Sequence, residues 1–296
     1  MLACIAVWLA FGPRSSVLVS VLTIVASLVL SVGLVAAGLW IWPPRWALIP
    51  LGLLVAFAAI RKWQRRERGS TSDRAIGSVL AAGAMAALGT FLLWSGITGR
   101  MAPEGQGIAL ASPLPRGRGY CALSAGSNLV MNLHYVEGEK TAASFEKHSV
   151  DFVKVASDGT RTTPARRWHP KPLHPSDYAI FDAPVSAPCS GEVVETVNDR
   201  PDNLAGHRFR RLDGANRVTI RCEGVLVMLA HLKRGSVSVE IGDTLAVGEP
   251  IGVVGNSGNT EEPHLHIHAQ TDEGDRASRP VVMLFDQRYI ARGDCL

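Results

Sequence analysis

Charge is scarce in this sequence: Asp, Glu, Lys and Arg make up 19% of its 296 residues, against about a quarter in an ordinary soluble domain. Aromatic residues are also few, at 6%, whereas apolar residues reach 47% and the mean hydropathy is +0.15. This balance excludes a disordered chain, a coiled coil and a miniprotein held together by disulfides. Because no basic stripe with interleaved aromatic residues is present, we expect no nucleic-acid partner.

Charged residues are scarcest in the first third of the chain. Residues 1–100 therefore read as a membrane anchor, with helices expected at 17–42, 46–60 and 75–97. The first and third runs are uncharged and long enough, at about 1.5 Å per residue, to cross a hydrocarbon core of roughly 30 Å. The run at 46–60 is shorter. It would span only a thinned bilayer, and a buried core helix is the alternative.

The orientation of this anchor is indicated by a cluster of basic residues. They precede the last expected helix and are Arg61, Lys62, Arg65, Arg66, Arg68 and Arg74. Basic residues mark cytoplasmic loops, so the helix at 75–97 should run outward. We therefore expect a multi-pass protein of the cytoplasmic membrane, in contact with the lipid bilayer, whose C-terminal domain is extracytoplasmic.

Cysteine usage agrees with an oxidising compartment. Four cysteines follow the anchor, and four allow three pairings. Our hypothesis is Cys189–Cys222 together with Cys121–Cys295. Their wide spacing disfavours a zinc site made of cysteines.

A linker is expected at 101–118, and residues 119–296 then predict a mainly antiparallel β domain. Short β-branched segments alternate there with glycine turns, and they are Val193–Val197, Val218–Cys222, Val225–Leu229, Val237–Ile241 and Ile251–Val254. No helical periodicity competes with this pattern in 180–270. The fold class is therefore an all-β sandwich or barrel-like domain preceded by an α-helical membrane region.

One predicted strand contains three histidines, His264, His266 and His268, separated by Leu265 and Ile267. On a strand, residues two apart share a face, so the three imidazoles point one way and the two apolar residues point into the core. Neutral imidazole is a preferred zinc ligand, and histidines on one strand face are a common start of a zinc site. The alternative is a polar strand face that happens to be rich in histidine.

Other motifs accompany this strand. They are VSAPCSG at 185–191, LAHL at 229–232, IGDTLAVGEPIGVVGNSG at 241–258 and PHLHIH at 263–268. With these motifs the chain resembles the lysostaphin/LytM-type zinc metallopeptidases over about residues 120–290. The resemblance implies a compact β fold of the barrel-sandwich or duplicated-hybrid-motif type. It also implies a Zn²⁺ ion held by a His, an Asp and the second His of a His-x-His strand.

Carried over residue by residue, the resemblance implies that His266 is a zinc ligand. It implies that His231 and His264 are catalytic without binding the metal. The family's Asp is best matched by Asp151 in HSVDFVKV, but Lys147 stands where the family's first His is expected.

Two histidines can supply the missing ligand, His134 and His148. We favour His134, because His148 and Asp151 are an odd number of residues apart and would face opposite sides of a strand. A neighbouring strand can instead bring His134 beside Asp151. His174 with Asp177 is a weaker alternative.

Residues near the expected ligands and catalytic histidines are expected to have supporting roles. His268 is expected to support the site or to be exposed, and not to bind the metal. Asn256, Ser257 and Asn259 are expected to rim the substrate groove. The long segment 152–180 is expected to be a solvated surface insertion, with a regulatory flap as the alternative.

The first functional interpretation is a membrane-anchored zinc metalloendopeptidase that hydrolyses peptide bonds, in peptidoglycan, by a zinc-activated water. The alternative is a non-catalytic LytM-like module that binds the wall or regulates a partner protein. Lys147 keeps this alternative open, whereas the presence of His231, His264 and His266 favours the enzyme.

Overall fold

The computed structural model describes residues 1–12, 14–38, 45–66, 74–105, 107–135, 144–166, 174–207, 214–273 and 278–296. These residues form two compact units, one helical (Met1–Thr98) and one rich in strands (Gly99–Leu296). Arg68 and the last residues of the helix expected at 17–42 lie outside the described residues.

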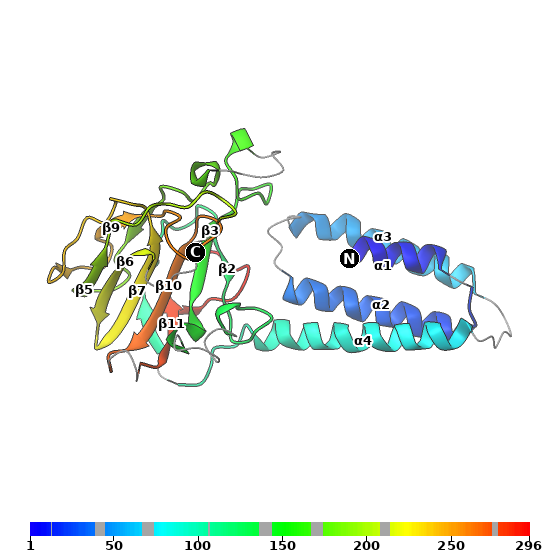
Figure 1. Ribbon diagram of the computed structural model, residues 1–296. Helices are drawn as coiled ribbons and strands as arrows, with labels where there is room; N and C mark the ends of the chain where they lie inside the picture. The colour runs from blue at the N-terminus through cyan, green and yellow to red at the C-terminus, as the bar shows by residue number, and fades with distance from the viewer. Residues whose placement is uncertain are drawn as a thin grey trace. The chain divides into compact units, whose positions relative to one another are not determined.

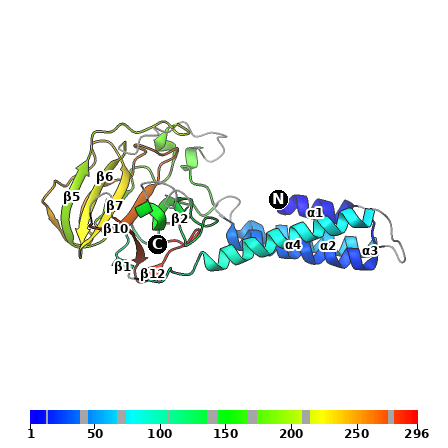
Figure 2. The ribbon, with the colours of Figure 1, turned by 60° about the horizontal axis from the view of Figure 1, so that its bottom comes forward.

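The described part of the N-terminal unit consists of α-helices. They are α1 (Leu2–Phe11), α2 (Val17–Ala37), α3 (Leu48–Gln64) and α4 (Arg74–Thr98), with a 3-10 turn at Arg45–Ala47 before α3. Helices α2 and α4 run side by side along their length (Figures 1 and 2), and α1 packs on α3. Arg65, just after α3, donates from Nη1 to the Ala10 carbonyl at 2.7 Å. It thereby satisfies a carbonyl that the end of α1 leaves without a helical partner.

Glycines allow α2 and α4 to meet at backbone contact. A Cβ atom on Gly89 would lie 2.5 Å from Leu30 Cα, and one on Gly96 would lie 2.6 Å from the carbonyl carbon of Ala36. Small residues permit such close approach in membrane helix pairs. The contact of Gly89 with Leu30 is followed, further along both helices, by the contact of Gly96 with Ala36. The two helices therefore run in the same direction.

Two helices are long and apolar enough to cross a membrane, Val17–Ala37 with a mean hydropathy of 2.6 and Ile76–Thr98 with 1.9. They lie within or closely match the segments expected at 17–42 and 75–97. Helix α3 begins close to the expected 46–60 segment and continues to Gln64. Its 17 residues fall short of the roughly 20 that a full span requires.

We predict that Gly89→Ile forces α2 and α4 apart, because the new side chain would collide with the backbone of α2. The expected loss in stability of the helical unit is about 1–3 kcal/mol. It is measured as the SDS fraction at which the full chain in detergent loses helical circular dichroism. Gly83→Ile in the same helix is the matched control, since no atom lies within 4 Å of a Cβ built there. Equal losses in the two variants would contradict the packing.

The C-terminal unit is organised around a mostly antiparallel sheet (Figure 1). Its main path runs β1-β11-β10-β7-β6-β5-β8, with β3 beside β10, β2 beside β3 and β12 beside β11. Strands β4 and β9 form a separate pair. The bounds are β1 Gly107–Leu110, β2 Tyr120–Ser124, β3 Val150–Lys154, β4 Pro184–Ser186, β5 Gly191–Val197, β6 Asn216–Cys222, β7 Val225–Leu232, β8 Thr244–Leu245, β9 Pro250–Val253, β10 Leu265–Thr271, β11 Pro280–Phe285 and β12 Arg288–Tyr289.

Strand β10 is the centre of this sheet. It pairs with β7 along one edge, while its other edge pairs first with β3 and then with β11. Leu265 and Ile267 are fully buried in the apolar core, as the period-2 pattern predicts. His266 and His268, on the opposite face, are also buried, at 4% and 1% exposed. The histidine strand is therefore covered on both faces.

Two expectations about the strands differ from the structure. Residues 107–110, expected within a linker, form β1, which pairs in parallel with β11 and so belongs to the sheet. Residues 237–241 do not form a ladder strand. Val237 and Val239 pack against the core, but the Val237 N–H donates to the side-chain oxygen of Asn198 at 3.0 Å.

The predicted disulfide pairing is confirmed. Cys121 is bonded to Cys295, and Cys189 is bonded to Cys222. The first bond ties β2 to the C-terminal end of the chain, and the second joins the turn before β5 to the end of β6.

Candidate metal centre

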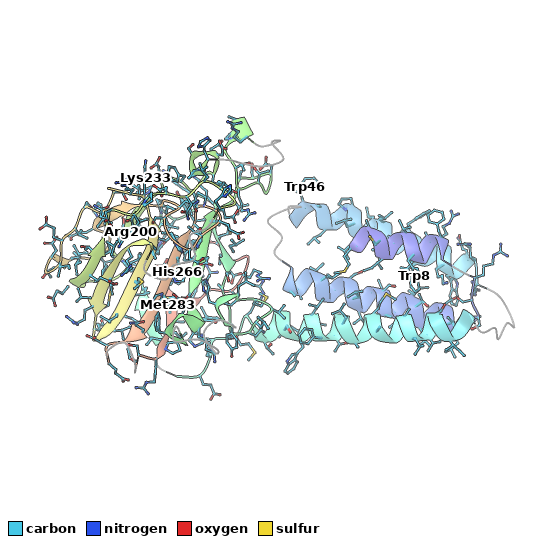
Figure 3. The ribbon with its side chains drawn as sticks, viewed as in Figure 1. Trp8, Trp46, Arg200, Lys233, His266 and Met283 are labelled. Carbon is cyan, nitrogen blue, oxygen red and sulfur yellow. A yellow bond between two sulfur atoms is a disulfide. The ribbon has the colours of Figure 1, made fainter. Side chains whose placement is uncertain are left out.

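The register between β3 and β10 places Asp151 directly opposite His266. On the other edge of β10, His266 pairs with Ala230, the residue before His231. Side chains opposite one another on neighbouring antiparallel strands lie close enough to interact. The sheet therefore brings an aspartate and a histidine together at one level, beside the end of β7. His266 lies on β10 within the β unit (Figure 3).

Asp151 is bound by two imidazoles. Its Oδ2 lies 2.8 Å from His134 Nε2, and its Oδ1 lies 2.9 Å from His266 Nδ1. One donor atom from each of these three residues lies within 4.8 Å of the other two. Two ring nitrogens and a carboxylate thus converge in a site where Asp151 is only 8% exposed.

His134 reaches the site from the connection between β2 and β3, where residues 134–135 are helical, and not from a strand, so this part of the expectation is wrong. The loop is held by Asn132, which is fully buried. Its side-chain nitrogen donates to the carbonyls of Gly126 at 3.2 Å and Ser149 at 3.1 Å, and its side-chain oxygen accepts from the His134 N–H at 3.1 Å. Asn132 therefore ties the His134 loop to the start of β3, which carries Asp151.

The two histidines that were expected to be catalytic lie beside this triad. The His231 and His264 rings are 4.6 Å apart between centroids, and His264 Nε2 is 3.6 Å from Asp151 Oδ1. Each Nδ1 faces a main-chain carbonyl: His231 donates to Ser257 at 2.8 Å, and His264 donates to Glu262 at 2.9 Å. Because a carbonyl only accepts, both rings carry their proton on Nδ1 when neutral. Each Nε2 is then a basic nitrogen.

His231 occupies its position through an unusual backbone conformation. It follows Ala230, which shares the face of His266, so a regular strand would point His231 to the opposite face. Its φ of +64° instead places it in the left-handed region, where non-glycine residues are uncommon. Such conformations cost free energy and are concentrated at functional sites.

The charges of the site agree with this geometry. Burial alone would raise the pKa of Asp151, but the His134 and His264 imidazoles and the hydrogen bonds from His134 and His266 lower that pKa well below its usual value. Burial lowers the pKa of His231 well below its usual value, and repulsion from His264 and His266 lowers it further. The site therefore contains an ionised carboxylate next to a neutral histidine.

His268 is buried and contacts the triad, so it is not an exposed residue. Its Nδ1 lies 3.0 Å from His266 Nε2, and Glu146 has a carboxylate oxygen within 4.8 Å of a nitrogen of each of these histidines. The strand pattern placed His268 on the correct face. The contribution of Glu146, from the 3-10 turn at Ser144–His148, had no signal in the sequence.

The alternative ligands lie elsewhere among the described residues. His148 belongs to neither of the two clusters with metal-ligand spacing, and burial lowers its pKa to about 4. Asp177 accepts a hydrogen bond from Arg166 Nε at 3.0 Å and another from the His174 N–H at 3.2 Å. His174 and Asp177 thus belong to a local turn.

The residues expected to rim the groove also have another role. Asn256 and Ser257 are fully buried. The Ser257 hydroxyl donates to the Leu232 carbonyl at 2.7 Å, and the Ser257 carbonyl holds His231. Ser257 therefore supports His231 from the core, Asn256 is buried, and Asn259 is exposed.

With this geometry in view, comparison with known families gives one match. Residues 176–280 match the model of peptidase family M23. The C-terminal unit carries an M23 peptidase domain. The match contains His231, His264 and His266 but begins after His134 and Asp151. The sheet register and the Asn132 loop are therefore what associate those two residues with the M23 histidines.

Solved structures with similarity to the chain include three peptidases. Lysostaphin from Staphylococcus simulans is 18% identical, with 57% of this chain and 52% of lysostaphin covered and a TM-score of 0.31. The catalytic domain of the prophage-encoded M23 protein EnpA from Enterococcus faecalis is 16% identical, with coverages of 45% and 73% and a TM-score of 0.29. A zinc-containing peptidase from Vibrio cholerae is 17% identical, with coverages of 59% and 39% and a TM-score of 0.33.

The chain thus spans about half of lysostaphin and less than half of the Vibrio peptidase. No curated protein matched the chain. The assignment to M23 rests on the family match.

We predict that Asn132→Ala loosens the loop that carries His134, because it leaves buried carbonyls without their donor. The loss should be about 1–3 kcal/mol of local stability. It should appear as faster hydrogen–deuterium exchange at residues 131–135 of the full chain in detergent. Asn198→Ala is the control: it removes an asparagine that also bonds a main-chain segment, at Val237. Unchanged exchange at 131–135 in Asn132→Ala would contradict the role of Asn132.

Proposed function

We propose that this protein is a membrane-anchored zinc metalloendopeptidase that hydrolyses peptide bonds in peptidoglycan. The observation that carries the proposal is the convergence of His134, Asp151 and His266 beside two histidines whose Nδ1 atoms are held by carbonyls. It occurs within a unit that carries an M23 peptidase domain.

The donor set fits a zinc ion. Zinc prefers imidazole nitrogen and carboxylate oxygen, and catalytic sites use three protein ligands. The Asp151 carboxylate lies between His134 Nε2 and His266 Nδ1, so a cation bound here would replace the protons that these nitrogens share with it. A zinc ion bound by these residues would polarise a peptide carbonyl and increase the acidity of a water molecule.

His231 and His264 supply the proton chemistry in this proposal. With Nδ1–H donated to a carbonyl, each ring keeps its basic Nε2 for the reaction. One can accept the proton of the attacking water, and the other, once protonated, can stabilise negative charge on the carbonyl oxygen. Their 4.6 Å ring separation allows both to reach one peptide bond.

The anchor and its orientation are supported by the helical unit. Because α2 and α4 are parallel, a chain that crosses the bilayer in both must return between them, and α3 is the described helix in that interval. Basic residues at the end of α3, such as Arg61 and Lys62, favour the cytoplasmic side there. Helix α4 then runs outward, and the two disulfides of the β unit agree with an oxidising compartment.

The proposal is tested on the full chain in detergent by measuring bound zinc and the release of peptide fragments from peptidoglycan. We expect one zinc per chain and cleavage. His266→Ala should lose both. His231→Ala should keep zinc and reduce cleavage by about a hundred-fold or more, the size of a general acid–base contribution. The exposed His207 provides the control, since His207→Ala should retain both properties.

Two outcomes would contradict the proposal. A folded wild-type chain with neither zinc nor cleavage would favour the non-catalytic binding module. Full zinc content in both His134→Ala and His266→Ala would show that the metal is bound elsewhere.

A further inference from the structure

The segment 152–180 is not wholly the solvated insertion expected from the sequence, because residues 152–154 belong to β3 and Phe152 is buried in the core. The rest of the segment is anchored by a short antiparallel stem. Its two sides are joined by hydrogen bonds from the Ala179 N–H to the Arg161 carbonyl at 2.9 Å and from the Thr163 N–H to the Asp177 carbonyl at 2.8 Å. The Arg166–Asp177 ion pair, at 3.0 Å, closes the stem. Arg167 and Lys171 lie beyond it, outside the described residues. The stem is therefore an ordered part of the β unit.

Two side chains of this stem converge on Glu262. Arg161, from one side, forms an ion pair with the Glu262 carboxylate through Nη1. Tyr178, from the other side, hydrogen-bonds the same carboxylate. Burial and the neighbouring Glu262 charge raise the pKa of Tyr178 to about 12, so its hydroxyl remains a donor at neutral pH. The Glu262 side chain is thus held by a cation and a hydroxyl from a distant part of the chain.

The main chain of Glu262 in turn holds His264. The Glu262 carbonyl oxygen accepts the Nδ1–H of His264 at 2.9 Å, and the Thr260 hydroxyl lies 2.7 Å from the same oxygen. This hydrogen bond selects the ring tautomer of His264 and directs Nε2 toward Asp151. One residue therefore links the stem, through its side chain, to His264, through its backbone.

We propose that Glu262 is a positioning residue for His264, and that Arg161 and Tyr178 hold it in place. The stem of segment 152–180 thereby supports a histidine of the proposed peptidase site. The inference rests on the proposed function for its effect on cleavage, but the tautomer of His264 can be measured independently of any activity.

The direct test is NMR of the full chain in detergent, with ¹⁵N-labelled histidine rings. In the wild type we expect His264 to carry its proton on Nδ1. In Glu262→Ala and Arg161→Ala this preference should be lost or mixed, while the His231 tautomer, set by Ser257, stays unchanged. Glu192→Gln is the control, because it removes an acidic partner of Arg221 in a surface ion pair. His264→Gln assigns the resonance.

The kinetic test uses soluble cross-linked muropeptides. Glu262→Ala, Arg161→Ala and Tyr178→Phe should lower kcat by up to about a hundred-fold, because a misplacement of a reacting group by about 1 Å can cost this much. KM and zinc content should stay near wild type. The Arg161→Ala/Glu262→Ala double variant should lose no more than the worse single variant, since the two residues act through one contact.

The outcomes separate the two proposals. A His264 tautomer and a kcat that are both unchanged in Glu262→Ala would overturn the positioning role, even if the wild type cleaves. If the His264 tautomer changes in Glu262→Ala but the wild type shows no cleavage, the positioning role holds and the peptidase proposal is rejected. If Glu262→Ala fails to fold, Tyr178→Phe, which removes a single hydroxyl, decides in the same way.

Discussion

The pairing of β3 with β10 is the constraint on which the site depends. It places Asp151 opposite His266, and β7 on the other edge of β10 brings His231 to the same level. Because side chains alternate along a strand, a shift of one residue in this register would turn Asp151 away from His266. Leu265 and Ile267, fully buried in the core, oppose such a shift, since it would also displace them. The apolar core thus determines the geometry of the polar cluster.

The strand pattern of the histidines could be predicted from sequence, because period 2 is a local property. Asp151 was recognised in another way, through the resemblance of HSVDFVKV to the family's Asp strand, and it is the second residue of β3. His134 was favoured over His148 on the assumption that both candidates lie on strands, but His148 ends the 3-10 turn before β3 and His134 lies in a helical turn between β2 and β3. Asn132 holds this segment through hydrogen bonds to the carbonyls of Gly126 and Ser149, and no local sequence pattern predicts such contacts. The role of Glu146 beside His268 was missed for the same reason.

The two units of the chain are held together by different interactions. In the helical unit, glycines such as Gly89 permit backbone contact between the parallel helices α2 and α4. In the β unit, buried hydrogen bonds and disulfides hold loops onto the sheet. The Arg161–Glu262 ion pair does the same for the segment 152–180, because it bonds this segment to the loop that orients His264. The family match begins at residue 176, so this ion pair crosses from outside the matched region into it.

The central proposal is that a zinc ion is held by His134, Asp151 and His266. It is tested most directly by zinc X-ray absorption spectroscopy of the zinc-loaded full chain. The account predicts a first shell of nitrogen and oxygen only, with multiple-scattering features of two imidazoles. His134→Ala should bind less zinc, and the zinc that it retains should show one imidazole. A sulfur neighbour, or two imidazoles retained in His134→Ala, would contradict it.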